Sequence, residues 1–150
     1  MSRTDWQKYF FKFTALASER ATCMRRKVGA VLVKDNMVVA TGYNGAPRGL
    51  PHCEDLGGCE RAKSNIPSGE RHELCRGLHA EQNAIIQAAR SGVNINGADL
   101  YCSYRPCSIC TKMIINAGIL RVFYYEDYND ALAESLAKQS NVQFIKTDKE

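Results

Sequence analysis

The sequence has few histidines and prolines, little net charge and no long apolar segment. No apolar run approaches the roughly 20 residues that a membrane-spanning helix requires, so we expect no membrane partner. The first ten residues, MSRTDWQKYF, lack the apolar core of a secretory signal, which predicts a cytoplasmic protein. Because internal repeats and low-complexity tracts are also absent, we expect residues 1–150 to form a single domain.

The excess of basic residues is small. Lys and Arg number 20 and Asp and Glu number 16, which gives a net charge of +4. This balance suits a phosphorylated small molecule but is weaker than the basic stripe of a nucleic-acid-binding protein. We therefore expect no nucleic-acid partner.

Cysteine, in contrast, is frequent for a chain expected in a reducing compartment. Cytosolic cysteines more often bind metals or act in catalysis than form disulfides. An odd number would also leave one thiol unpaired in any complete disulfide scheme. The seven cysteines lie at positions 23, 53, 59, 75, 102, 107 and 110.

Hydrophobic periodicity predicts helices and strands that alternate along the chain. In residues 4–20, apolar side chains recur at three- and four-residue steps, which predicts an amphipathic helix capped by Thr4 or Asp5. The apolar runs 28–33 and 37–43 predict a hairpin. The remaining elements are expected to be a helix at 79–91, a strand at 99–103, a helix at 107–117 closed by Gly118, a strand at 121–125, a helix near 130–139 and a strand at 142–147. This order predicts an α/β fold, a three-layer αβα sandwich around a five-stranded mixed sheet.

Residues 44–78 interrupt this alternation. The segment holds six glycines and three of the four prolines and has no sustained period. Such a long irregular insertion inside a compact domain usually has a function or is held in place by a local cross-link.

A metal site is indicated by Cys107 and Cys110. Three residues apart in one helix, they are expected to share a face, with Pro106 at the first helical position. The positive end of the helix dipole favours thiolates there. With His79, the two thiols provide three ligands for Zn²⁺ and leave the fourth position to water, as in catalytic zinc sites.

Glu81 adds an acid and base to this site. It lies two residues after His79, which corresponds to about 200° round a regular helix. The two side chains can therefore reach one metal ion only if that ion lies next to the first turn, at the start of the helix. Gly77 allows the sharp entry that this requires. A carboxylate beside an activated water can accept its proton and pass it to a leaving group.

Two other interpretations are open for these residues. A closed structural zinc site needs a fourth ligand, for which Cys102 is the local candidate, although strand alternation lets it face the core. A buried histidine with two inert cysteines is the other alternative. The order His-x-Glu followed by Pro-Cys-x-x-Cys favours catalysis, because it is the signature of zinc deaminases.

The sequence resembles the cytidine deaminase superfamily, and within it the deoxycytidylate (dCMP) deaminases. The matching segments VGAVLV, GYNGAPRG, HAEQNAI, RPCSIC and RVFYY extend from residue 28 to residue 125. The resemblance implies a cytidine deaminase-like fold and the hydrolytic deamination of dCMP to dUMP and ammonia. His79, Cys107 and Cys110 would then bind zinc, and Glu81 would transfer protons to the ring and to the departing amine.

The resemblance also implies contacts with the base and the sugar. The backbone at Ala80 would help to seat the base, and Tyr128 would cover the ring. Asn44, in the GYN segment, would contact the sugar. The alternative for Asn44 and Gly45 is a simple turn.

A substrate phosphate needs cationic or hydroxyl partners. We expect Arg26 with Ser103 and Tyr104. The family usually has threonine three residues before its Pro-Cys pair, where this chain has Ser103. The alternative for the basic run 25–27 is a solvated charge cluster.

A second, structural zinc is implied by some phage and bacterial relatives. This zinc would hold the long insertion in a fixed conformation. The alternative is a set of free thiols and a surface histidine. The expected ligands are Cys23, Cys53, His72 and Cys75, with Cys59 or His52 as substitutes.

The family is commonly hexameric, activated by dCTP and inhibited by dTTP, with Mg²⁺ accompanying the triphosphate. The corresponding effector segment here would be GYNGAPRG, in which glycine N–H groups could approach phosphates. Arg90 matches an arginine at a subunit contact, and its alternative is an exposed cation at a helix end. The expected effector residues are Gly42, Tyr43, Gly45 and Arg48.

Two other functions fit the same motifs. One is deamination of free deoxycytidine or of a base in a polynucleotide. The other is a non-catalytic zinc protein or nucleotide sensor with this fold, which the presence of Glu81 argues against.

Overall fold

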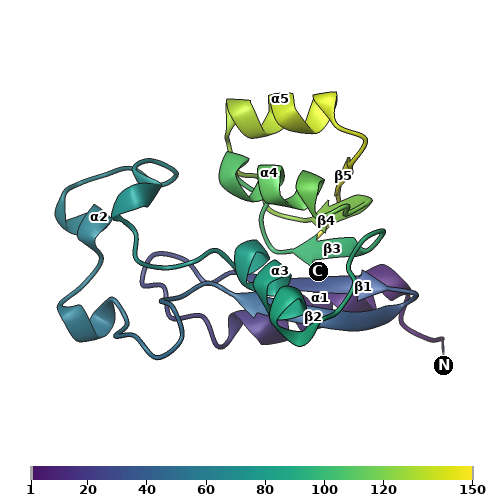
Figure 1. Ribbon diagram of the computed structural model, residues 1–150, viewed down its shortest axis with the longest axis horizontal. Coiled ribbons are helices and arrows are strands. Elements are labelled where there is room, and N and C mark those ends of the chain that lie inside the picture. Colours follow the sequence, from purple (N-terminus) through teal and green to yellow (C-terminus); the bar gives the residue numbers. More distant parts are fainter. Residues whose placement is uncertain (1, 150) are drawn as a thin grey trace.

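The structure is a computed structural model that describes residues 2–149 (Figure 1). The helices are α1 (Trp6–Ser18), α2 (Glu60–Lys63), α3 (Ala80–Ser91), α4 (Ser108–Asn116) and α5 (Ala131–Gln139). The strands are β1 (Gly29–Lys34), β2 (Met37–Tyr43), β3 (Asp99–Cys102), β4 (Arg121–Tyr124) and β5 (Gln143–Lys146). Each helix and strand expected from the sequence lies within two residues of its predicted bounds. Within residues 2–149, no helix combines the length and apolar character needed to cross a membrane.

The five strands form one mixed sheet in the order β2-β1-β3-β4-β5. Strand β1 is antiparallel to β2 and β3, whereas β3, β4 and β5 are parallel. The β1–β2 hairpin turns at Asp35 and Asn36, which both adopt positive φ angles, as Asn and Asp tolerate in tight hairpin turns. Helices α4 and α5 provide the crossovers that parallel strands require.

Helices cover both faces of the sheet, which confirms the predicted three-layer architecture. On one face, Phe10 of α1 packs against Val31, Tyr101 and Phe123. On the other, the alternating strand residues pack against α3 and α4, where alanines of α3 meet Ala30, Leu32, Ala40 and Leu100.

A close approach of α3 to β2 fixes the start of this helix. A Cβ at Gly42 would lie 2.2 Å from the carbonyl oxygen of Ala80 and 2.4 Å from the backbone nitrogen of Ala84. Only glycine leaves room for the helix at this distance. The first turn of α3 is therefore held directly against the sheet.

The insertion at 44–78 projects from the body of the molecule as an arm (Figure 1). Three short helical turns lie within it that the sequence pattern did not predict: η1 (Glu54–Leu56), α2 and η2 (His72–Leu74). Its ends meet, because Gly45 and Leu78 exchange backbone hydrogen bonds of 3.1 and 2.8 Å. The arm therefore returns to the sheet immediately before α3.

Candidate metal and nucleotide site

His79 is the N-cap residue of α3. Its backbone is extended (φ −78°, ψ 158°), so its side chain leaves the helix axis at the first turn. The Gln82 side chain accepts a hydrogen bond of 2.7 Å from the His79 backbone N–H. This capping contact holds the backbone from which the His79 side chain projects.

Cys107 occupies the same position on α4, again with an extended backbone (φ −71°, ψ 175°). The prediction that Pro106 is the first helical residue is therefore wrong: Pro106 precedes the N-cap, and Ser108 begins the helix. Cys107 thus lies just outside the helical turn that carries Cys110. The two thiols nevertheless converge, because both face the start of α3.

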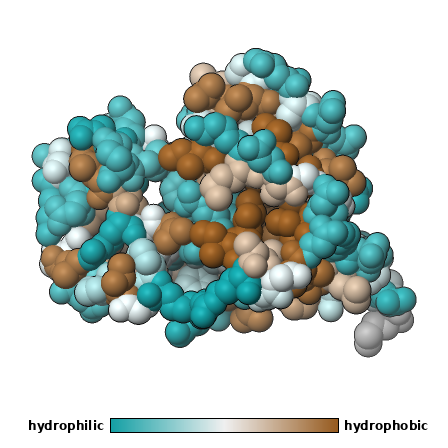
Figure 2. Space-filling view, in the orientation of Figure 1, coloured by the Kyte–Doolittle hydropathy of each residue, from teal (hydrophilic) through white to brown (hydrophobic). Residues whose placement is uncertain are grey.

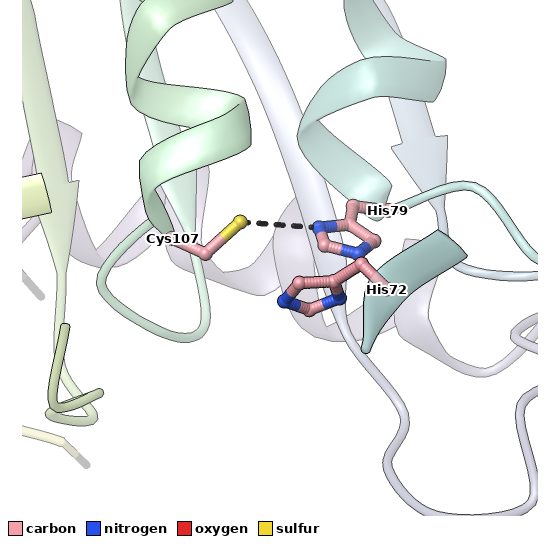
Figure 3. Close-up of side chains that lie close together, drawn as sticks. All are labelled: His72, His79 and Cys107. Atoms are coloured by element: carbon pink, nitrogen blue, oxygen red, sulfur yellow. Dashed lines mark hydrogen bonds between the residues drawn. The ribbon is translucent and has the colours of Figure 1, made fainter. Parts of the chain in front are cut away.

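The His79 imidazole lies between the two thiols (Figure 3 shows the contact with Cys107). Its Nδ1 is 3.4 Å from Cys107 Sγ and 3.3 Å from Cys110 Sγ. Ordinary zinc–sulfur and zinc–nitrogen bond lengths place tetrahedral neighbours about 3.6 Å apart. The spacing and the soft donors of these three side chains fit a zinc ion.

Glu81 lies beside this cluster. Ligand atoms of His79, Glu81 and Cys110 are all within 4.8 Å of one another. The Glu81 side chain is only 5% exposed, and burial raises the pKa of its carboxyl group. The first-turn geometry expected for the His-x-Glu pair is thus present, with a carboxyl group that holds a proton readily.

The thiols of Cys107 and Cys110 titrate as a coupled pair. A hydrogen bond from Cys110 lowers the pKa of Cys107 to about 4, an effect that burial opposes and His79 reinforces. The hydrogen bond to Cys107, together with burial, raises the pKa of Cys110. The hydrogen bond with Cys107 also raises the pKa of His79. Metal binding would therefore displace protons from this cluster.

Cys102 does not contribute to the cluster. It is buried in the core, and its Sγ donates a 3.8 Å hydrogen bond to the carbonyl oxygen of Phe123. The closed zinc site considered above therefore lacks its expected fourth thiol.

His72, rather than Cys102, lies next to His79 and Cys107. Its ring centroid is 5.0 Å from that of His79, with the rings inclined at 62°. Ligand atoms of His72, His79 and Cys107 lie within 4.8 Å of one another (Figure 3). Burial, and then the proximity of His79, lowers the pKa of His72. The HELC segment therefore brings its histidine to the predicted catalytic site, which sequence reasoning missed.

A cavity of about 230 Å³ opens beside the cluster. Its walls come from the start of α3, the segment before β1, the loop after β3 and the insertion. The predicted substrate residues that line it are Arg26, Asn44, Ala80, Tyr104 and Tyr128.

Arg26 is held over two aromatic rings. Its guanidinium carbon is 4.3 Å from the ring centroid of Tyr104 and 5.7 Å from that of Tyr128. Asn44 fixes the backbone of this segment, since its Oδ1 accepts from Val28 N–H at 2.9 Å and its Nδ2 donates to the Arg26 carbonyl at 2.7 Å. Asn44 thereby positions Arg26 as well as lining the cavity.

Ser103 is not brought to the cavity, contrary to the predicted phosphate contact. It is buried, and its Oγ accepts a 3.3 Å hydrogen bond from the backbone N–H of Gly29. The hydroxyl therefore connects β1 to the end of β3.

Arg61 lines the cavity but carried no signal in the sequence. It belongs to the four-residue helix α2 and is the only arginine among the buried side chains of residues 2–149. No periodicity in the insertion predicted that this one basic residue would turn inward.

The thiols expected at a second metal lie near one another without forming a closed ligand set. Burial raises the pKa of Cys53, and Cys75, Cys59 and Cys23 raise it further. Among residues 2–149, no group of three ligand atoms within 4.8 Å gathers these cysteines.

The expected effector segment is only partly exposed. Gly42 is buried against α3, and the Gly45 N–H already donates to the carbonyl oxygen of Leu78. Tyr43 and Arg48 are exposed. Arg90 is also exposed, in the last turn of α3.

Comparisons with known proteins agree with this geometry. The family model described as "Cytidine and deoxycytidylate deaminase zinc-binding region" matches residues 4–126. A deoxycytidylate deaminase from Schizosaccharomyces pombe is 44% identical over 142 residues, which cover 94% of this chain but 44% of the relative. The chain thus spans less than half the length of that protein.

Two phage proteins match over nearly their whole length. The deoxycytidylate deaminase of Mycobacterium phage D29 is 42% identical over 128 residues, which cover 83% of this chain and 97% of the relative. The crystal structure of the cyanophage S-TIM5 dCMP deaminase in complex with dCMP and dUMP aligns with a TM-score of 0.80 at 32% identity, covering 98% of this chain and 100% of the other. The chain belongs to the cytidine and deoxycytidylate deaminase family.

Proposed function

We propose that the protein is a zinc-dependent hydrolase that deaminates dCMP to dUMP and ammonia. The observation that carries the proposal is the convergence of His79 Nδ1 with the thiols of Cys107 and Cys110, next to the buried carboxyl group of Glu81. The S-TIM5 dCMP deaminase, whose structure contains dCMP and dUMP, supports the choice of substrate.

His79, Cys107 and Cys110 would hold the zinc ion. When bound, zinc activates water for attack on a ring carbon. Glu81 accepts one proton from water and delivers it to N3 of the ring, and it then transfers the second proton, from the new hydroxyl group on the ring carbon, to the departing amine. Burial raises the pKa of its carboxyl group, which makes the carboxylate a stronger base toward the proton of water.

The nucleotide would lie in the cavity beside these residues. The backbone of Ala80 helps to seat the base, and Tyr128 covers the ring. Arg26 and Tyr104 contact the phosphate. Asn44 approaches the sugar with its remaining hydrogen-bonding capacity, while holding Arg26 in place.

A second, structural zinc would use Cys23, Cys53 and Cys75, and His72 if its ring turns away from His79. The mutual effect of these thiols on the pKa of Cys53 supports the proposal. Two zinc ions per chain, falling to one in a Cys53→Ser variant, is the expected result of a metal analysis.

Control by dCTP and dTTP, each with Mg²⁺, would act at the GYNGAPRG segment, where Tyr43 and Arg48 are exposed. A homo-oligomer, proposed as a hexamer, would bury part of α3. Apolar side chains gather around this helix on the face in Figure 2, and Ile86 is 44% exposed. Arg90 would join this contact. Such an enzyme would work in the cytoplasm.

The test is ammonia release from dCMP, deoxycytidine and a deoxycytidine-containing oligonucleotide by zinc-quantified protein, with and without Mg-dCTP. Turnover of dCMP alone is expected, and dCTP should increase it. Preference for deoxycytidine or for the oligonucleotide would assign a different substrate. No turnover of any of the three at full zinc occupancy would contradict deamination of these substrates.

A further inference from the structure

Arg61 is a buried cation with almost no partner. Its side chain is 8% exposed, and its one hydrogen bond runs from Nη2 to the carbonyl oxygen of Pro67 at 3.4 Å. Its Nε is buried and has no hydrogen-bond partner among the described residues. A planar guanidinium offers five donors, so most of its bonding capacity is unused.

The charge of Arg61 also has no ion-pair partner in the part of the chain that the structure describes. The helix neighbour of Arg61, Glu60, is paired with Lys63 at 3.4 Å. Burying an unpaired cation is strongly unfavourable, so the position of Arg61 calls for an anion supplied from outside the chain.

Arg61 is one of the residues that line the cavity beside the metal-binding cluster. Burial raises the pKa of Tyr128, which lines the same cavity, and the positive charge of Arg61 opposes this rise. Arg26 acts on Tyr128 in the same way. Two guanidinium groups from distant parts of the chain therefore approach one aromatic side chain in one cavity.

The arm contacts the body of the protein next to Pro67, the residue that accepts the Arg61 hydrogen bond. Gly69 has a φ angle of +85°, and a Cβ there would lie 2.5 Å from the Tyr128 hydroxyl oxygen. Arg25 Nη2 donates a 2.9 Å hydrogen bond to the Ile66 carbonyl. These contacts hold residues 66–69 against the body of the protein, and Pro67 in that stretch accepts from Arg61.

We infer that Arg61 binds the phosphate monoester of the nucleotide, with Arg26, and thereby selects a nucleoside monophosphate over the nucleoside. A guanidinium can donate two parallel hydrogen bonds to a phosphate. The inference rests on the proposed function for the identity of the nucleotide. It gives the insertion a direct role in substrate choice.

The test compares the binding of dUMP and deoxyuridine to zinc-loaded protein by calorimetry. The variants are Arg61→Met, which keeps the length of the side chain, and Lys63→Met, which removes a charge from the exposed side of the same helix. Arg61→Met should weaken dUMP binding by roughly 10- to 100-fold and leave deoxyuridine binding within about twofold. Lys63→Met should change neither affinity.

Equal loss of both ligands in Arg61→Met, at full zinc content and unchanged thermal midpoint, would overturn the inference by assigning Arg61 a structural role. Unchanged dUMP binding, or a wild-type protein that binds dUMP no more tightly than deoxyuridine, would also overturn it. If Arg61→Met does not fold, Arg61→Lys, which keeps the charge but loses the paired geometry, should weaken dUMP selectively. Phosphate selectivity through Arg61 in a protein that releases no ammonia would sustain this inference and contradict the proposed function.

Discussion

The carboxylate of Asp130 accepts a 2.8 Å hydrogen bond from the backbone N–H of Ser108, the first residue of α4. Its other oxygen accepts from Ala133 N–H at 3.0 Å and caps α5. One side chain thus satisfies the free N–H groups of two helices. Burial acts to raise the pKa of Asp130, but these hydrogen bonds outweigh it and lower the pKa. Because Cys107 directly precedes Ser108, this carboxylate also supports the metal-binding cluster.

Replacing Asp130 by Ala should therefore lower stability and zinc affinity together. The loss of two caps should cost about 2–3 kcal/mol. Zinc affinity, measured by competition with a chromogenic chelator, should fall about tenfold. Asp127→Ala is the control, since Asp127 forms only an exposed ion pair with Lys146 and should change stability by less than about 0.5 kcal/mol. Equal effects of the two substitutions would contradict the role of Asp130.

Gln82 is expected to be a determinant of the His79 orientation. Gln82→Leu removes the acceptor of the His79 N–H, which should cost about 1 kcal/mol and lower the thermal midpoint by about 3 °C. Gln82→Glu keeps the acceptor and should retain the wild-type midpoint. A thermal midpoint of the Leu variant equal to that of wild type would show that the capping contact contributes nothing.

Because Tyr101 is buried, the free energy of unfolding is expected to fall at alkaline pH. Burial raises the pKa of Tyr101 to about 12, whereas an exposed tyrosine titrates near 10.0. Between about pH 10 and pH 12 the folded protein therefore retains a proton that the unfolded chain loses. The contribution of Tyr101 to stability is fully present below about pH 10 and is lost as the pH rises to about 12. Two pH units correspond to at most about 3 kcal/mol. Urea titrations at pH 9 and 11 should show this decline in wild type and a smaller one in Tyr101→Phe; equal declines would exclude Tyr101 as its source.

The order of helices and strands was predictable because apolar periodicity follows burial in regular elements. The zinc cluster was predictable for another reason. His79 with Glu81, and Cys107 with Cys110, are each close in sequence, so local spacing defines each half of the site. The position of Pro106 could not be predicted, because the extended backbone of Cys107 decides where α4 begins.

The contribution of the insertion could not be read from the sequence. Its path depends on tertiary contacts such as the Gly45–Leu78 pairing and the contact of Gly69 with Tyr128. These contacts have no periodic signature. They bring His72 to the predicted catalytic cluster and turn Arg61 inward, whereas motif matching assigned His72 to a second metal and gave Arg61 no role.

The carboxyl group of Glu81 is expected to transfer protons during deamination of dCMP. The most direct measurement is ammonia release from dCMP by wild type and by Glu81→Gln, each with its zinc content determined. Wild type should release ammonia, and the variant should lose at least about 100-fold of this activity at unchanged zinc content. A fully active Glu81→Gln protein, or a zinc-loaded wild type without activity on dCMP, would contradict this expectation.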